Sequence, residues 1–318
     1  MDGLKIVKAL DNIKDNDNDT LYLIESITEK TGFFCNDGKL IFIVKDEADL
    51  TCEAIETEYL KLQTHIRISS VKNFQTFKDG YYNLIIFNAE TSNENIFDFI
   101  NLCEVYARNE EELSFRDFFY TLISIFQLPS EKKYINAIGL YGELKFMEYC
   151  AKKMDLDISQ YWHRHGELSQ YDFSNGDKFI EIKSNSNGSD IVIIKHDQIF
   201  KVSDGYLVLV STYIDDTGET INELIESMQE EKKYFNNINF NINLTKELKR
   251  ISEIDCQTVR FVVKEIKMFN TKDINPFDNV PVEINELKYK YDMSECIEIE
   301  KREIVGLLND FLHTIHST

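Results

Sequence analysis

The sequence predicts a mixed α/β protein with a β-rich first part and a core ordered helix–strand–strand–strand–helix–strand in its middle. Short β-branched or aromatic segments bounded by Asn, Asp and Gly fill much of residues 1–90. Apolar residues at helical spacing follow as far as about residue 153. With 43% hydrophobic and 29% charged residues among 318, the composition is that of a globular protein with a real core.

The first part, residues 1–130, is expected to contain four strands and two helices. The strands alternate or are wholly apolar, and turn signals such as Asp37-Gly38 and Asp79-Gly80 precede two of them. Pro129 closes the second helix. The predicted strands are 21–26, 39–45, 64–69 and 81–88, and the predicted helices are 93–107 and 115–127.

The middle part, residues 131–215, begins with a helix and continues mainly as strands. The segment 174–177 (SNGD) predicts a hairpin turn, and the last strand is almost wholly apolar and therefore buried. The predicted elements are a helix at 134–153, strands at 171–173, 179–184 and 190–195, a short helix at 197–202 and a strand at 205–212.

The last part, residues 216–318, is expected to be an α/β extension packed on the core. It predicts a helix at 219–234, an Asn-rich loop, a strand at 258–269 and a helix at 302–313. No internal repeat and no Pro- or Gly-rich linker separates the three parts, so we expect them to pack together.

The charge balance argues against a general nucleic-acid coat protein. The chain has 35 Lys and Arg against 56 Asp and Glu, a net charge of −21. Salt screens charges beyond about 10 Å, so a local basic groove can still act. Residues 61–78 contain no acid, and their basic side chains are candidate phosphate contacts; the alternative is a strand pair with a solvated polar face. These candidates are Lys61, Arg67, Lys72 and Lys78.

Other sequence features exclude several classes of protein. The six cysteines contain no CxxC pair, so neither a cysteine zinc site nor a disulfide framework is expected. No apolar run approaches the length of about 20 residues that a membrane helix needs. The N-terminal segment lacks the pattern of a secretory signal. We therefore expect a reduced, cytoplasmic protein without a membrane segment.

The strand at 179–184 carries the most informative pattern. Side chains alternate along a strand, so Glu181 and Lys183 share the face opposite Ile182. Charged groups on a half-buried face are costly unless they are paired or bind something. The hairpin would bring Asp172 beside Glu181, where the two carboxylates repel each other. A divalent cation such as Mg²⁺, which prefers oxygen ligands, would remove this conflict.

Three further side chains are expected near this cation. Lys183 would lie next to the metal-bound water and stabilise developing charge. Glu143 lies on the preceding helix, where Gly139 and Gly142 each cost about 1 kcal/mol relative to Ala. These glycines indicate close packing of the helix on the sheet, which would carry Glu143 to the metal. Gln198 opens the short helix after the third strand.

The order of these residues resembles the PD-(D/E)XK nuclease superfamily. GLYGELKFMEY (139–149), Trp162, YDF (171–173), FIEIKS (179–184) and HDQIF (196–200) are similar to a bacterial subfamily of PD-(D/E)XK motif proteins, over roughly a quarter of the chain. The resemblance implies a restriction-endonuclease-like αβββαβ core. It implies metal-binding positions at Asp172, Glu181, Ile182 and Glu143, and catalytic positions at Asp172, Glu181, Lys183, Glu143 and Gln198. The proline that often precedes the aspartate is Tyr171 here.

The resemblance implies a Mg²⁺-dependent endonuclease for double-stranded DNA, with Mn²⁺ as a substitute. It would be the cleaving component of a bacterial restriction or phage-defence system, acting as a homodimer or by two sequential nicks. The resemblance also implies methyltransferase or ATPase partners, and because the chain has no Walker loop, any ATP dependence would come from such a partner. Two alternatives stay open: a non-catalytic nuclease-fold subunit or acidic adaptor that docks partner proteins, and an RNA-directed nuclease.

Competing patterns also occur in the chain. Glu-x-Lys is a weak signal, and Glu265-Ile266-Lys267 with Asp255 repeats it, although without the preceding helix. Residues 162–165 (WHRH) suggest a zinc or proton-shuttle site, but no third ligand lies at a suitable spacing. We therefore expect this segment to be a loop at the rim of the site. His196 is expected to be a surface residue at the end of a strand.

Overall fold

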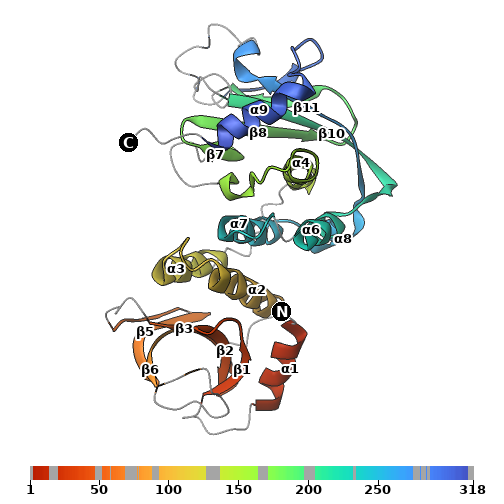
Figure 1. Ribbon diagram of the computed structural model, residues 1–318. Coiled ribbons are helices and arrows are strands. Elements are labelled where there is room, and N and C mark those ends of the chain that lie inside the picture. The colour runs from red at the N-terminus through yellow and green to blue at the C-terminus, as the bar shows by residue number, and fades with distance from the viewer. Residues whose placement is uncertain are drawn as a thin grey trace. The chain divides into compact units, whose positions relative to one another are not determined.

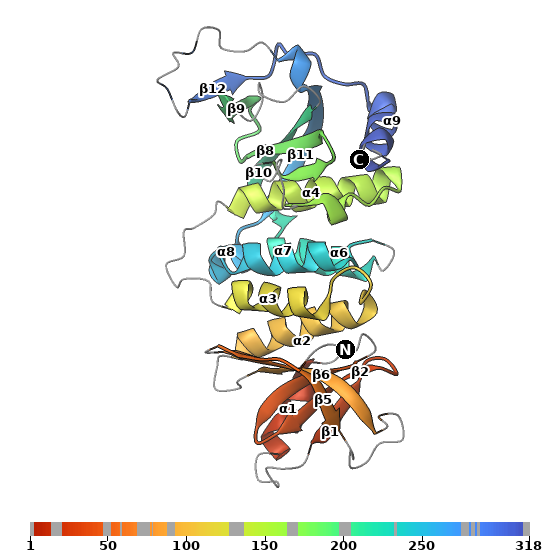
Figure 2. The same ribbon diagram turned by 90° about the vertical axis from the view of Figure 1, so that its left-hand side faces the viewer.

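The protein is represented by a computed structural model that divides into two compact units, Met1–Ser130 and Glu131–Thr318 (Figures 1 and 2). The mixed α/β fold is confirmed, and the three-part division of the sequence stays a prediction. Among the described helices, none has the length and apolarity needed to cross a bilayer. The described residues are 3–13, 21–46, 52–57, 59–68, 77, 79–87, 93–126, 137–163, 171–196, 205–231, 234–274, 280, 284 and 287–313.

The first unit is built on one antiparallel sheet with helices beside it. Its strand order is β1 (Tyr22–Ser26), β2 (Thr31–Asn36), β3 (Lys39–Lys45), β6 (Gly80–Phe87), β5 (Leu60–Ile68) and β4 (Ala54–Glu56). The helices are α1 (Gly3–Ile13), α2 (Asn93–Arg108) and α3 (Phe115–Phe126). Phe42 of β3 packs against Phe33, Tyr106 and Phe118, so an aromatic core joins the sheet to α2 and α3.

The sequence did not predict α1, β2 or β4. The buried segment of β2 shows no alternation, since five successive residues from Thr31 are buried. Such a run lacks the period-2 signal on which strand prediction rests. β5 begins at Leu60, four residues before the predicted strand.

The second unit contains a four-stranded sheet and a separate strand pair. The sheet order is β11 (Phe261–Asn270), β10 (Gly205–Glu219), β8 (Lys178–Asn185) and β7 (Phe173–Asn175), with β8 and β10 parallel. β9 (Ile191–Lys195) pairs with β12 (Lys288–Asp292). The helical segments are α4 (Ala137–Met154), η1 (Ser159–Tyr161), α6 (Ile221–Glu230), α7 (Ile238–Leu248), α8 (Glu253–Thr258), η2 (Thr271–Asp273) and α9 (Lys301–Leu312).

The C-terminal part differs from the prediction at three elements. The predicted helix at 219–234 starts only at Ile221, because β10 runs to Glu219 and Thr220 forms a capping box with Glu223. The predicted Asn-rich loop is the helix α7, whose N-cap Asn237 accepts a hydrogen bond from the Phe240 amide. The predicted strand at 258–269 starts at Phe261, after the short helix α8. The short helix predicted at 197–202 lies outside the described residues.

Helix α4 packs directly on one face of the sheet, as Figure 2 shows. Ile180, Ile182, Val208 and Val210 belong to the same buried cluster as the apolar side chains of α4. A Cβ on Gly142 would lie only 1.8 Å from Ser184 Oγ on β8. The predicted close approach is therefore confirmed at this glycine.

The same prediction is wrong for Gly139. Among the described residues, a Cβ there would meet nothing within 4 Å, so this glycine is not required by the approach of any of them. The two glycines of one helix thus differ in their surroundings, and only Gly142 is required by packing.

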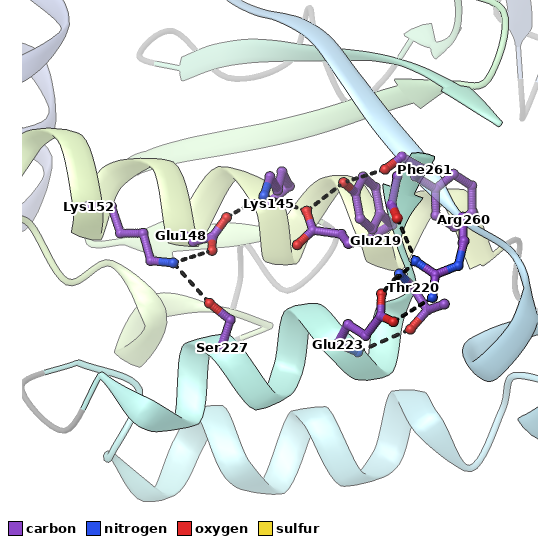
Figure 3. Close-up of polar contacts among 11 residues, drawn as sticks. Lys145, Glu148, Lys152, Glu219, Thr220, Glu223, Ser227, Arg260 and Phe261 are labelled. Atoms are coloured by element: carbon purple, nitrogen blue, oxygen red, sulfur yellow. Dashed lines mark hydrogen bonds and ion pairs between the residues drawn. The ribbon is translucent and has the colours of Figure 1, made fainter. Parts of the chain in front are cut away.

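A polar seam ties α4 to α6 and to the end of β10 (Figure 3). Lys145 Nζ lies 2.5 Å from Glu148 Oε2 and 2.6 Å from Glu219 Oε1. Lys152 Nζ lies 2.7 Å from Glu148 Oε1 and 2.9 Å from Ser227 Oγ on α6. Burial acts to raise the pKa of Glu148, but hydrogen bonds from the two lysines outweigh it and lower that pKa. The seam therefore fixes the helix that carries Glu143.

Candidate functional site

Five of the predicted residues, Glu143, Asp172, Glu181, Ile182 and Lys183, lie where α4 meets β7 and β8. The β7–β8 hairpin pairs Asn175 with Lys178 and turns at Gly176, which has a φ of 61°. Phe173 pairs with Ile180, and the next residues along the two strands are Asp172 and Glu181. Asp172 Oδ2 accepts a hydrogen bond from the Ile182 amide at 2.6 Å, which fixes its carboxylate at this edge of β8.

Glu181 is a buried carboxylate with one unsatisfied oxygen. The residue is only 3% exposed. Its Oε1 lies 2.5 Å from Lys183 Nζ, whereas its Oε2 is buried with no hydrogen-bond partner among the described residues. The Ile182 side chain belongs to the apolar core, so only its main-chain carbonyl could serve as a ligand. An orphaned buried carboxylate oxygen is costly and fits a position that binds a cation.

Glu143 reaches the same place from α4. Its Oε2 accepts a hydrogen bond from Trp162 Nε1 at 2.7 Å and lies 3.1 Å from His163 Nε2. One ligand atom from each of Glu143, His163 and Asp172 lies within 4.8 Å of the others, so these three side chains could hold a metal ion.

The electrostatics of the site favour a bound cation. Burial, then the charges of Glu181 and Glu143, raises the pKa of Asp172 well above its ordinary value. Burial also raises the pKa of Glu181, although Lys183 opposes this change. Burial lowers the pKa of His163, but the hydrogen bond and charge of Glu143 outweigh it, and the net pKa is raised. A divalent cation would stabilise the ionised carboxylates against their burial and mutual repulsion.

The segment that presents His163 is held from two sides. Trp162 is fully buried, and its carbonyl accepts hydrogen bonds from Asn239 Nδ2 at 2.7 Å and Asn243 Nδ2 at 2.8 Å. The His163 amide donates to the Asp172 carbonyl at 2.8 Å. His163 has a φ of 45°, in the left-handed region that favours glycine. Two amide side chains of α7 therefore position the imidazole.

Sequence reasoning missed the contribution of His163 and of the two asparagines. The described partners of the imidazole come from α4 and from the residue before β7, not from its own segment of the sequence. Glu143 and Asp172 thus provide the further candidate ligands that the spacing within 162–165 did not indicate, and metal binding there stays a prediction. A signal that could have found Asn239 and Asn243 is their spacing of four, which places two amides on one face of a helix.

The remaining predicted residues do not join this cluster. Gln198, Lys72 and Lys78 lie outside the described residues, and their roles stay predictions. Lys61 and Arg67 lie on β5 in the first unit. Lys61 Nζ is 3.1 Å from Glu56 Oε2, and Arg67 Nη2 is 3.3 Å from Asp79 Oδ2. These two cations are thus ion-paired, as on a solvated strand face.

The competing Glu-x-Lys pattern lies in a different environment. Lys267 Nζ lies 2.9 Å from Asp190 Oδ1 and 3.3 Å from Glu265 Oε1 on β11, whereas Asp255 belongs to helix α8. Glu265 is about a third exposed, unlike the buried Glu181. His196 follows β9 and is partly buried, with Nδ1 3.4 Å from Tyr289 Oη.

Comparison with protein families gives a match over most of the chain. Residues 45–294 match the model described as "Putative PD-(D/E)XK family member, (DUF4420)". No curated protein and no solved structure matches the chain. The matched region includes α4, the β7–β8 hairpin and α7, and so the whole cluster around Glu143. The chain belongs to this PD-(D/E)XK family.

Proposed function

We propose that this protein is a divalent-metal-dependent endonuclease that hydrolyses phosphodiester bonds of double-stranded DNA. The observation that carries the proposal is the buried Glu181 carboxylate, whose Oε2 has no partner among the described residues, beside Asp172 and Lys183. Membership of the PD-(D/E)XK family supports the same chemistry. The residues fit a cation, because the buried Glu181 carboxylate and the half-buried Asp172 carboxylate converge there.

The proposed roles follow from what each group can do. Asp172, Glu181 and the Ile182 carbonyl would hold Mg²⁺ or Mn²⁺, with Glu143 as a further oxygen donor. The bound cation would acidify a water molecule and neutralise a phosphate oxygen. Lys183, held by Glu181 at 2.5 Å, would stabilise the negative charge that develops on the phosphoryl oxygens. The hydrogen bond from the Ile182 amide would keep the Asp172 carboxylate oriented toward the cation.

The test is cleavage of supercoiled plasmid DNA in Mg²⁺ or Mn²⁺ by the full chain and two variants. We expect metal-dependent nicking or linearisation that falls by at least about 10²-fold in Lys183→Ala, the loss typical of removing a charge-stabilising donor. Lys267→Ala is the matched control, since it lies in the other Glu-x-Lys pattern and should retain full cleavage. Equal cleavage by wild type and Lys183→Ala would overturn the proposal.

We further propose that this nuclease is the cleaving component of a bacterial restriction or phage-defence system. Methyltransferase or ATPase partners would supply target selection, and a homodimer would supply the second cut. The net charge of −21 supports delivery of DNA by a partner or by a local basic surface. Comparing modified with unmodified plasmid tests the restriction role, and RNA competition tests the choice of nucleic acid.

The charge also supports a second candidate function, a non-catalytic adaptor that docks basic partners. Lys61 and Arg67 already have acidic partners in the first unit, which weakens their case as phosphate contacts. An adaptor would not bind Mn²⁺ at Asp172 and Glu181. Calorimetric Mn²⁺ binding that disappears in Asp172→Ala would reject this candidate.

A further inference from the structure

We infer that His163 is a ligand of the cation, and that Glu143, His163 and Asp172 form a mixed imidazole–carboxylate site that selects Mn²⁺ over Mg²⁺. The inference deepens the proposed function, because it concerns the cation of the same site. It assigns a nitrogen donor to a site for which the sequence indicated oxygen donors alone.

Three side chains place candidate ligand atoms close together. The candidate ligand atoms of Glu143, His163 and Asp172 all lie within 4.8 Å of one another. Metal–ligand bonds of about 2.1 Å allow two donors on one ion to lie up to about 4.2 Å apart. Side-chain rotations that shorten the longest of these separations would therefore bring the three atoms around one ion. His163 Nε2 already faces Glu143 Oε2 at 3.1 Å, so the imidazole is turned toward the cluster.

Next to Asp172, the buried carboxylate of Glu181 has an oxygen without a hydrogen-bond donor in the described part of the chain. Glu181 is 3% exposed, and its Oε2 has no hydrogen-bond partner among the described residues. The register that pairs Phe173 with Ile180 places Glu181 beside Asp172. A buried oxygen left without a donor beside the candidate ligand Asp172 indicates that a positive ion belongs there.

The backbone at His163 is held in an uncommon conformation by several hydrogen bonds. Its backbone φ of 45° is one that residues other than glycine rarely adopt, and residues with such angles are frequent at ligand sites. Its amide is bound to the Asp172 carbonyl, and the carbonyl of the preceding residue is bound by Asn239 and Asn243. The backbone is thus fixed independently of the imidazole. This arrangement orients a ligand before the ion arrives.

The chemistry of the donors sets the choice of ion. Mg²⁺ takes oxygen ligands almost exclusively and keeps several of its waters. Imidazole favours first-row transition ions, of which Mn²⁺ also accepts carboxylates readily. A site with one imidazole and two carboxylates therefore discriminates against Mg²⁺.

The test uses the full chain loaded with Mn²⁺, which is paramagnetic. Pulsed electron paramagnetic resonance detects coupling of Mn²⁺ to a directly bound ¹⁴N nucleus. We expect this coupling in the wild type and its loss in His163→Ala, with Mn²⁺ affinity falling by at least the 10–100-fold typical of losing a supporting residue. Calorimetry should show tighter binding of Mn²⁺ than of Mg²⁺ in the wild type.

The chain offers a matched control in His65. It also has a positive φ, 54°, and its Nδ1 lies 2.8 Å from the Asp46 carboxylate, but it belongs to the first unit. His65→Ala should keep the nitrogen coupling and the Mn²⁺ affinity. The His163→Gln variant, whose side-chain amide oxygen has a similar reach, should bind Mn²⁺ without nitrogen coupling. The difference between its Mn²⁺ and Mg²⁺ affinities should be smaller than in the wild type. Fluorescence of Trp162, next to the altered residue, reports whether the variants fold.

The outcomes separate this inference from the proposed function. Bound Mn²⁺ without nitrogen coupling in the wild type would overturn the inference, and so would the absence of Mn²⁺ binding. If cleavage then still depends on Lys183, the nuclease proposal stands alone. Nitrogen-coupled Mn²⁺ without cleavage of any nucleic acid would support the metal site and reject the nuclease.

Discussion

Replacing Gly142 by alanine tests how closely α4 must approach the sheet. The added Cβ would lie 1.8 Å from Ser184 Oγ, 2.9 Å from Ser184 Cβ and 3.6 Å from Val210 Cβ. A rotation of the serine hydroxyl removes the first contact, but the second requires α4 and β8 to separate. Overpacking of this kind costs about 1–3 kcal/mol, and the better helix propensity of alanine returns about 1 kcal/mol.

Gly139→Ala is the matched control within the same helix. Its Cβ would meet no described residue within 4 Å, so only the propensity gain of up to about 1 kcal/mol remains. Because this gain is common to both variants, it cancels in their comparison. We expect Gly142→Ala to be less stable than Gly139→Ala by about 1–3 kcal/mol.

Urea unfolding followed by tryptophan fluorescence measures this difference in the second unit. Trp162 is the single tryptophan of the sequence and is fully buried in the core beside α4. Ser184→Gly removes both close contacts, so the Gly142→Ala/Ser184→Gly double variant should show a favourable coupling energy of about 1 kcal/mol or more. Equal stability of the two alanine variants would refute the argument that Gly142 is required by packing.

Three further predictions concern the site and its support. Asp172→Asn should stabilise the metal-free protein by about 0.5–2 kcal/mol at pH 7. The folded-state pKa of Asp172 is raised, so its ionisation destabilises the fold above pH 3.8, and urea midpoints should converge as the pH is lowered toward that value. Glu148→Gln should cost about 1–3 kcal/mol at pH 7. The lowered pKa of Glu148 means that its contribution, present above pH 4.5, is lost as the pH falls through the folded-state pKa; a deficit that grew in acid would contradict this. Asn243→Ala should cost about 1 kcal/mol and weaken Mn²⁺ binding, whereas Asn309→Ala on α9 should leave binding unchanged in calorimetry.

The hairpin and its carboxylates could be predicted from sequence because their determinants are local. Alternation along β8 fixes which side chains share a face, and a Gly-Asp turn fixes the register that places Asp172 beside Glu181. The Gly142 contact was predictable for a similar reason, since glycine in a helix has a cost that packing must offset.

The remaining features depend on contacts between distant segments. Asparagine has a low helix propensity, so the composition of α7 favoured a loop. The helix forms because Asn237 caps it, and because Asn239 and Asn243 find a buried carbonyl to bind. His163 becomes a candidate ligand only when α4 and the start of β7 meet beside it, and no spacing in sequence reports that meeting.

The contacts made by α7 and α9 have a consequence for when the site can form during synthesis. The Trp162 carbonyl gains its hydrogen bonds only when Asn239 and Asn243 have been synthesised. The side-chain amide of Asn175 likewise donates to the Phe311 carbonyl at 2.6 Å. Every acidic group of the cluster is translated before residue 182, yet their supports follow 57 to more than 120 residues later, by the differences 239 − 182 and 311 − 182. A nascent chain therefore carries α4 and the β7–β8 hairpin without these hydrogen bonds until α7 and α9 have been synthesised. Under the proposed function, the metal site would therefore take its final form only after α7 has been synthesised.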